Sequence, residues 1–94
     1  MTLFDLADVL GKDIIIRRYP NQKGRFVAEF DHCETQEYKG SGVLRSDYGN
    51  GESPIEALND YASNIKGKNL VFNAMSESRS EFVCPETITS LEEI

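Results

Sequence analysis

The chain has 94 residues and a formal net charge of −6, with 39% apolar residues and nine aromatic residues, five Phe and four Tyr. This length suits one domain spanning residues 1–94, and the composition is that of a folded protein. No apolar run is longer than three residues, the length of the isoleucine run at 14–16, so the sequence predicts no segment that spans a membrane. A core this small leaves little room for a deep substrate pocket.

The charge is unevenly distributed along the chain. Residues 11–25 carry five basic side chains against Asp13 alone, a net charge of +4, whereas the rest of the chain is acidic. An acidic body repels nucleic acid, so direct nucleic-acid binding is not expected, although a local basic patch can hold a phosphate backbone. Two cysteines are too few for a disulfide framework and fit a reducing compartment.

The N-terminal half reads as a short helix followed by a hairpin. Thr2 is placed to cap a helix whose apolar residues recur at helical spacing. Residues 13–19 and 25–31 are predicted strands, because the first is rich in isoleucine and the second alternates apolar with polar side chains. The polar stretch 32–40 is predicted as a loop or an exposed strand end. Residues 41–48 are predicted as a third strand that returns Tyr48 to the core face.

The C-terminal half contains the strongest local signal, a helix over residues 53–66. Ser53 is its expected N-cap, Pro54 suits its first position, and Glu56 completes a capping box. The Gly-Asn-Gly sequence at 49–51 before it is predicted as a turn. Strands are predicted at 69–75 and 79–84. The acidic tail 86–94 either frays or packs lightly through Ile88 and Leu91.

The predicted order is therefore α-β-β-β-α-β-β. This order indicates an α+β fold in which an antiparallel sheet of four to five strands is covered on one face by one main helix. No internal repeat or low-complexity segment interrupts the domain.

Chemical motifs are sparse. His32 lies next to Cys33, but neighbouring residues of an extended chain point to opposite faces, which argues against a catalytic dyad. The histidine and cysteines also lack the paired spacing of a zinc site. The glycine-containing turn before the main helix is not followed by the lysine of a nucleotide-binding loop. The sequence thus predicts a non-enzymatic protein without catalytic residues, metal or cofactor.

The predicted order of a helix, three strands and a second helix over residues 2–66 resembles that of the double-stranded-RNA-binding domain. Gly51 and Ser53 match the glycine and serine before that family's second helix. That family holds phosphates with lysines at the start of this helix, where the present chain has Pro54, Ile55 and Glu56. The resemblance therefore implies the topology without the RNA binding. The hairpin-plus-helix order also resembles the antitoxin-like HicB domain.

Residues 48–62 and 65–74, with the sequences YGNGESPIEALNDYA and IKGKNLVFNA, resemble small proteins encoded by bacteriophages and prophages. This resemblance implies an accessory protein in the cytoplasm of a bacterial host. Such proteins act by binding a host component, including host-defence complexes, as an anti-CRISPR does.

Three functional hypotheses follow. The leading one is a protein that occupies the surface of a host protein or protein–nucleic acid complex, where three carboxylates of the main helix and the turn before it imitate phosphates: Glu52, Glu56 and Asp60. The second is a nucleic-acid-binding or antitoxin-like regulator that uses the basic hairpin: Arg17, Arg18, Lys23 and Arg25. The third is a structural homodimer joined through an exposed strand edge at 79–84 or 41–48. A simpler explanation opposes each of the first two hypotheses. The carboxylates of an acidic helix face are often only in contact with solvent. An arginine of a strand often packs its aliphatic stem at the margin of the sheet while its charged group stays in water.

Overall fold

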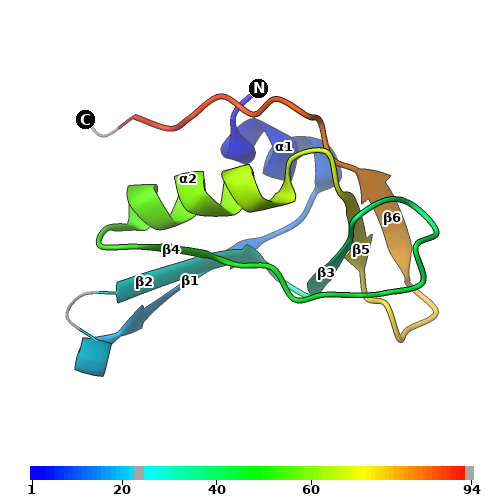
Figure 1. Ribbon diagram of the computed structural model, residues 1–94, viewed down its shortest axis with the longest axis horizontal. Coiled ribbons are helices and arrows are strands. Elements are labelled where there is room, and N and C mark those ends of the chain that lie inside the picture. The colour runs from blue at the N-terminus through cyan, green and yellow to red at the C-terminus, as the bar shows by residue number, and fades with distance from the viewer. Residues whose placement is uncertain (23–24, 93–94) are drawn as a thin grey trace.

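The chain has an α+β fold, seen in a computed structural model that describes residues 1–22 and 25–92. Two helices and two antiparallel sheets of three strands each make up this described part (Figure 1). The elements in chain order are α1 (Leu3–Leu10), β1 (Ile14–Tyr19), a short 3-10 helix (Pro20–Gln22), β2 (Arg25–Phe30), β3 (Cys33–Gln36), β4 (Gly49–Gly51), α2 (Pro54–Ile65), β5 (Asn69–Phe72) and β6 (Ser80–Val83).

The predicted hairpin is confirmed and forms most of the first sheet, whose strand order is β1-β2-β4. β1 pairs antiparallel with β2 from Ile14 opposite Phe30 to Tyr19 opposite Arg25. The alternation of β2 turns Phe26, Ala28 and Phe30 toward α2, which lies along this face of the sheet (Figure 1). The main helix is also confirmed, with Ser53 Oγ accepting the N–H of Glu56 at 3.1 Å.

One core joins the two helices to both sheets. Its buried members come from α1, β2, α2 and β5, together with the residue that follows β6: Leu3, Leu6, Ala28, Phe30, Ala57, Leu58, Tyr61, Ile65, Leu70, Phe72 and Cys84. The ring of Phe30 meets the rings of Tyr61 and Phe72 edge to face, with centroid distances of 5.8 and 5.7 Å. Edge-to-face contact is the favoured arrangement of aromatic rings in a core.

The Gly-Asn-Gly segment was predicted as a turn but forms β4, which lies directly on the backbone of α2. A Cβ added to Gly51 would lie 2.5 Å from the amide nitrogen of Ala57, and one added to Gly49 would overlap the backbone of Ala57 and Tyr61. Only residues without a Cβ allow a strand to approach a helix this closely. The glycines therefore serve packing rather than chain reversal.

The predicted single sheet is instead two sheets, because the chain bends sharply between β2 and β3. His32 takes a left-handed backbone conformation (φ 55°), and its carbonyl accepts the N–H of Asn73 (φ 53°) at 2.9 Å. His and Asn are among the side chains that tolerate this region best. The bend transfers the chain to the second sheet, with strand order β3-β5-β6.

Two further predictions in the middle of the chain are wrong. The stretch 32–40, expected as a loop or an exposed strand end, contains β3, whose Thr35 and Gln36 are buried polar residues. The expected strand at 41–48 is irregular except for a bridge between Arg45 and Thr35. Gly40 and Gly42, with φ of 85° and 80°, interrupt extended backbone before and within that segment.

The C-terminal segment, as far as Glu92, packs on the helices. Of the two alternatives for this tail, fraying or light packing, the structure shows packing. Ile88 and Leu91 pack against the core, and the side chain of Asn59 forms two hydrogen bonds with the backbone of Leu91, of 2.7 and 2.9 Å. A parallel bridge joins Thr2 to Thr89.

No helix within the described residues is long and apolar enough to cross a membrane.

Candidate functional site

The first sheet has a second face that neither helix covers (Figure 1). We call it the open face. The register brings to it alternate side chains of three strands that are neighbours in the sheet: Ile15, Arg17 and Tyr19 of β1, Arg25, Val27 and Glu29 of β2, and Asn50 of β4. Tyr48, just before β4, lies on the same face. Residues 17, 19 and 25 lie far from 48 in sequence, so the face is a product of the fold.

A groove of about 350 Å³ lies on the open face. It is lined by two arginines, two tyrosines, a valine and a glutamate: Arg17, Arg25, Tyr19, Tyr48, Val27 and Glu29. Val27 is only 6% exposed although it points away from the core, whereas Tyr19 and Tyr48 are 41% and 44% exposed. The tyrosine rings thus offer apolar surface that nothing in the described chain covers fully. Tyr48 was expected on the core face, and that prediction is wrong.

The basic residues of the hairpin are divided between the two faces. On the open face, Arg17 Nη1 pairs with Glu29 Oε1 at 2.7 Å, and this hydrogen bond raises the pKa of Arg17. Arg25 Nε donates to Asn50 Oδ1 at 2.7 Å, and its guanidinium lies 5.8 Å from the Tyr19 ring centroid. Arg18 faces the opposite side, over the ring of Phe26.

The predicted basic patch is therefore only partly assembled. Arg17 and Arg25 share the groove, Arg18 does not, and Lys23 lies outside the described residues. The neutral amide of Asn50 orients Arg25. The charged residues that line the groove are two arginines and one glutamate, in a chain whose net charge is −6.

The three acidic candidates lie beside β4, and two of them hold it in place. Asp60 Oδ2 accepts the N–H of Asn50 at 2.8 Å, and Glu56 Oε2 accepts the N–H of Glu52 at 2.8 Å. Asn64 adds a bond to the carbonyl of Tyr48 at 3.0 Å. Glu56 and Asp60 thus fix the strand on α2, and the exposed Glu52 contributes its backbone to the same arrangement.

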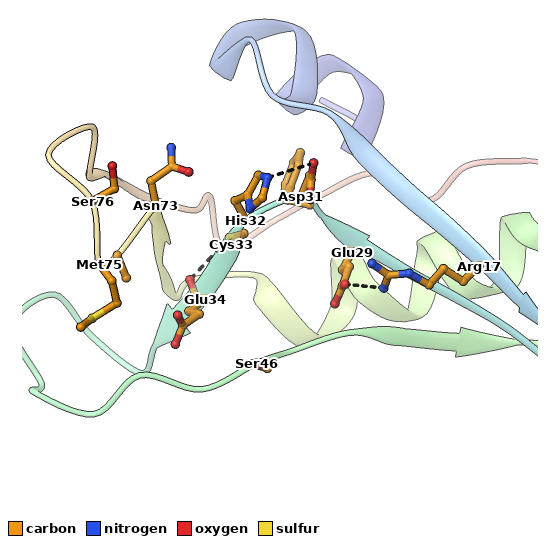
Figure 2. Close-up of a pocket in the computed structure, with 12 residues that line it drawn as sticks. Arg17, Glu29, Asp31, His32, Cys33, Glu34, Ser46, Asn73, Met75 and Ser76 are labelled. Carbon is orange, nitrogen blue, oxygen red and sulfur yellow. Dashed lines mark hydrogen bonds and ion pairs between the residues drawn. The ribbon is translucent and has the colours of Figure 1, made fainter.

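A second hollow of about 620 Å³ lies where the two sheets meet (Figure 2). It adjoins the groove, since Arg17 and Glu29 line both. Its remaining wall is mostly polar and comes from β2, the bend, β3, Ser46 and the 73–76 turn: Phe30, Asp31, His32, Cys33, Glu34, Ser46, Asn73, Ala74, Met75 and Ser76.

His32 and Cys33 do not form a dyad. The imidazole is 74% exposed, and its Nε2 lies 3.5 Å from Asp31 Oδ2, whereas Cys33 packs against the core. Figure 2 draws the contact between His32 and Asp31 as a dashed line. Burial raises the pKa of Cys33 to about 12, so its sulfur is a neutral thiol near pH 7. A protonated, buried thiol is a poor nucleophile.

Within residues 1–22 and 25–92, no three His, Cys, Asp or Glu side chains come close enough together to hold a metal ion. The strongest grouping of functional side chains is the groove of the open face.

Comparison with known proteins adds no relative, because no family model, curated protein or solved structure matches the chain. The site is therefore interpreted from geometry.

Sequence reasoning missed Tyr19 and Tyr48. The alternation of 17, 19, 25, 27 and 29 already places Tyr19 beside Arg25, but Tyr48 joins them only because β4 pairs with β2.

Proposed function

We propose that this chain is a non-enzymatic binding protein that occupies a surface of a partner protein through its open face. The observation that carries this proposal is the groove that Tyr19, Tyr48 and Arg25 line together with the buried Val27. Tyrosine and arginine are the side chains most enriched at the energetic centres of protein interfaces, where rigid aromatic surface and a planar cation combine.

The absence of a working His32–Cys33 pair supports a binding role over a catalytic one. The three carboxylates Glu52, Glu56 and Asp60 take a smaller part in the proposal than the sequence suggested, because Glu56 and Asp60 accept backbone amides of Glu52 and Asn50. Their charges still shape the outer field of the molecule, and this favours a partner that presents basic groups around the contact.

The partner, in this proposal, is a protein of a bacterial host, met in its cytoplasm. The support is the resemblance of residues 48–62 and 65–74 to small phage-encoded accessory proteins, which includes the groove residue Tyr48, β4, most of α2 and β5. A nucleic-acid-binding defence complex is the partner class that this resemblance favours, and occupation of its functional surface would inhibit it.

In-cell photo-crosslinking tests the contact surface. Tyr48 is replaced by benzoylphenylalanine in one version of the full chain, and Ser63, an exposed residue of α2, in a matched control. We expect the position-48 probe to yield a discrete crosslinked protein that the position-63 probe does not yield. Crosslinks from position 63 alone, or from neither position, would contradict the proposed surface.

Single-stranded nucleic acid is a second candidate partner, favoured by one observation. Two tyrosines and two arginines on an uncovered sheet resemble the stacking platforms that such proteins use. Glu29 in the lining of the groove and the net charge of −6 oppose it. Fluorescence anisotropy with single-stranded DNA and RNA at low salt distinguishes the two, and saturable, salt-sensitive binding that Arg25→Gln abolishes would favour nucleic acid.

A further inference from the structure

β1 forms an edge of the first sheet, and its hydrogen-bonding pattern is fixed by the ladder. The N–H of Asp31 donates to the carbonyl of Asp13 at 2.9 Å, so the odd-numbered residues of β1 bond to β2. In an antiparallel pair the alternate residues then direct their backbone groups outward. The outward amides are those of Ile14, Ile16 and Arg18.

Two of the other sheet edges are closed by the protein itself. On β4, Asp60 accepts the outward amide of Asn50. On β3, Thr35 and Arg45 exchange two backbone hydrogen bonds of 2.8 and 2.9 Å. Natural sheets cover or interrupt edges that would otherwise pair with another chain. β6 is also an edge, but it has four residues, whereas β1 has six and borders the groove through Arg17 and Tyr19.

The side chains of β1 indicate what would pair with it. Ile16 is 42% exposed, and Arg17 and Arg18 project from opposite faces of the strand. Side chains directly opposite one another across a pair of strands interact, and opposite charges stabilise while like charges destabilise. A complementary strand therefore carries apolar residues opposite the isoleucines and two adjacent carboxylates opposite the arginines. A second copy of β1 contains no carboxylate to offer.

We propose that β1 receives an extended segment of the partner protein as an added strand, with two adjacent acidic residues flanked by apolar ones. The inference rests on the proposed function and specifies how the partner engages. Backbone hydrogen bonds to Ile16 and Arg18 supply affinity, and the paired carboxylates supply register, as in other cases of strand addition. Arg17 uses one terminal nitrogen, Nη1, for Glu29, and its guanidinium carries further donors for the incoming carboxylate.

Nuclear magnetic resonance with two synthetic peptides tests the proposal on the full chain. The first peptide has two adjacent glutamates between valine and threonine residues, and the second has two lysines in their place. We expect the glutamate peptide to bind at least about tenfold more tightly. It should shift the amide signals of Ile16 and Arg18 and slow their exchange, and Arg17→Glu/Arg18→Glu should reverse the preference.

Several outcomes would overturn the proposal. Equal affinity for both peptides, or signal changes confined to the groove, would exclude strand addition. A doubled mass in solution with the β1 amides already protected would assign the edge to a second copy instead. Ile16→Pro removes one outward donor from an edge position where proline is tolerated. If this variant still crosslinks normally through position 48, the edge proposal fails while the proposed function stands.

Discussion

At the scale of single residues, Tyr61 connects the main helix to the first sheet. It is 1% exposed, and its hydroxyl oxygen accepts the N–H of Phe30 at 3.1 Å. That amide points away from β1 and would otherwise lack a partner in the interior. A buried donor without an acceptor carries the full penalty of its lost hydration.

Tyr61→Phe is therefore expected to lower the free energy of unfolding by about 1–3 kcal/mol. Tyr38→Phe is the matched control, because Tyr38 is 66% exposed and surface changes usually stay within about 0.5 kcal/mol. Urea denaturation followed by circular dichroism measures both. Equal effects of the two substitutions would show that the hydroxyl of Tyr61 does not satisfy the Phe30 amide.

The two thiols predict how stability depends on pH. Burial raises the pKa of Cys33 to about 12 and that of Cys84 to about 11, from 9.0. In the unfolded chain these thiols lose their protons at lower pH, so rising pH favours the unfolded state. The contribution of the neutral thiols is complete below pH 9 and is lost as pH rises toward 11–12.

Urea midpoints measured at pH 8 and pH 10.5 test this linkage. We expect the urea midpoint of the natural chain to fall between pH 8 and pH 10.5. The midpoint of the double variant Cys33→Ala/Cys84→Ala should fall by less over the same interval, whatever its value at pH 8. A double variant that loses as much stability over this interval would refute the assignment to the thiols.

At the scale of elements, β4 depends on its two glycines. Gly51→Ala places a methyl group against the backbone of α2, where neither element can yield without moving the other. We expect a loss of about 3 kcal/mol or more, at the upper end of overpacking effects. Gly40→Asn is the control, since nothing lies within 4 Å of an added Cβ there and Asn tolerates left-handed backbone at about 1 kcal/mol or less. Thermal unfolding of both variants provides the comparison, and a Gly51→Ala variant as stable as the control would mean that β4 does not pack on α2 as described.

The irregular segment 37–48 is anchored by Asp47. Its Oδ2 accepts a hydrogen bond from Thr35 Oγ1 at 2.5 Å and pairs with Lys68 Nζ at 3.0 Å, with both charged side chains about one-fifth exposed. Asp47→Ala should reduce stability by about 1–3 kcal/mol. Glu37→Ala, whose ion pairs are 3.6 and 3.9 Å long, should change it by less than about 0.5 kcal/mol. Denaturant titration measures the difference, and a reversed order would place the anchor elsewhere.

The same elements show which parts of the fold the sequence predicts. The hairpin and the main helix carry local signals, namely alternation in 25–30 and the cap formed by Ser53 and Pro54, and both are confirmed. β3 and β4 carry none. β3 is stabilised by buried polar pairing, where Asn69 donates to Gln36 at 2.8 Å, and β4 by contact between its glycines and a helix. Such long-range causes do not appear in the periodicity of a short window.

At the scale of the whole molecule, the fold places two adjoining hollows on the side opposite the main helix. The sequence predicted the arginines of this surface but not their division between two faces, because Arg17 and Arg18 are neighbours in the chain and opposites in the strand. It predicted the acidic residues of α2 but not that Asp60 closes the edge of β4. The candidate contact surface thus emerges only when register and topology are known.

The central claim is that the open face binds a protein partner through Tyr19 and Tyr48. Calorimetric titration of the partner identified by crosslinking, against three forms of the chain, tests it most directly. We expect Tyr19→Thr/Tyr48→Thr to weaken binding at least about tenfold while the melting temperature changes little, and Glu52→Gln to bind like the natural chain. If the tyrosine variant binds unchanged and Glu52→Gln loses affinity, the contact lies on the acidic start of α2 and the claim is wrong.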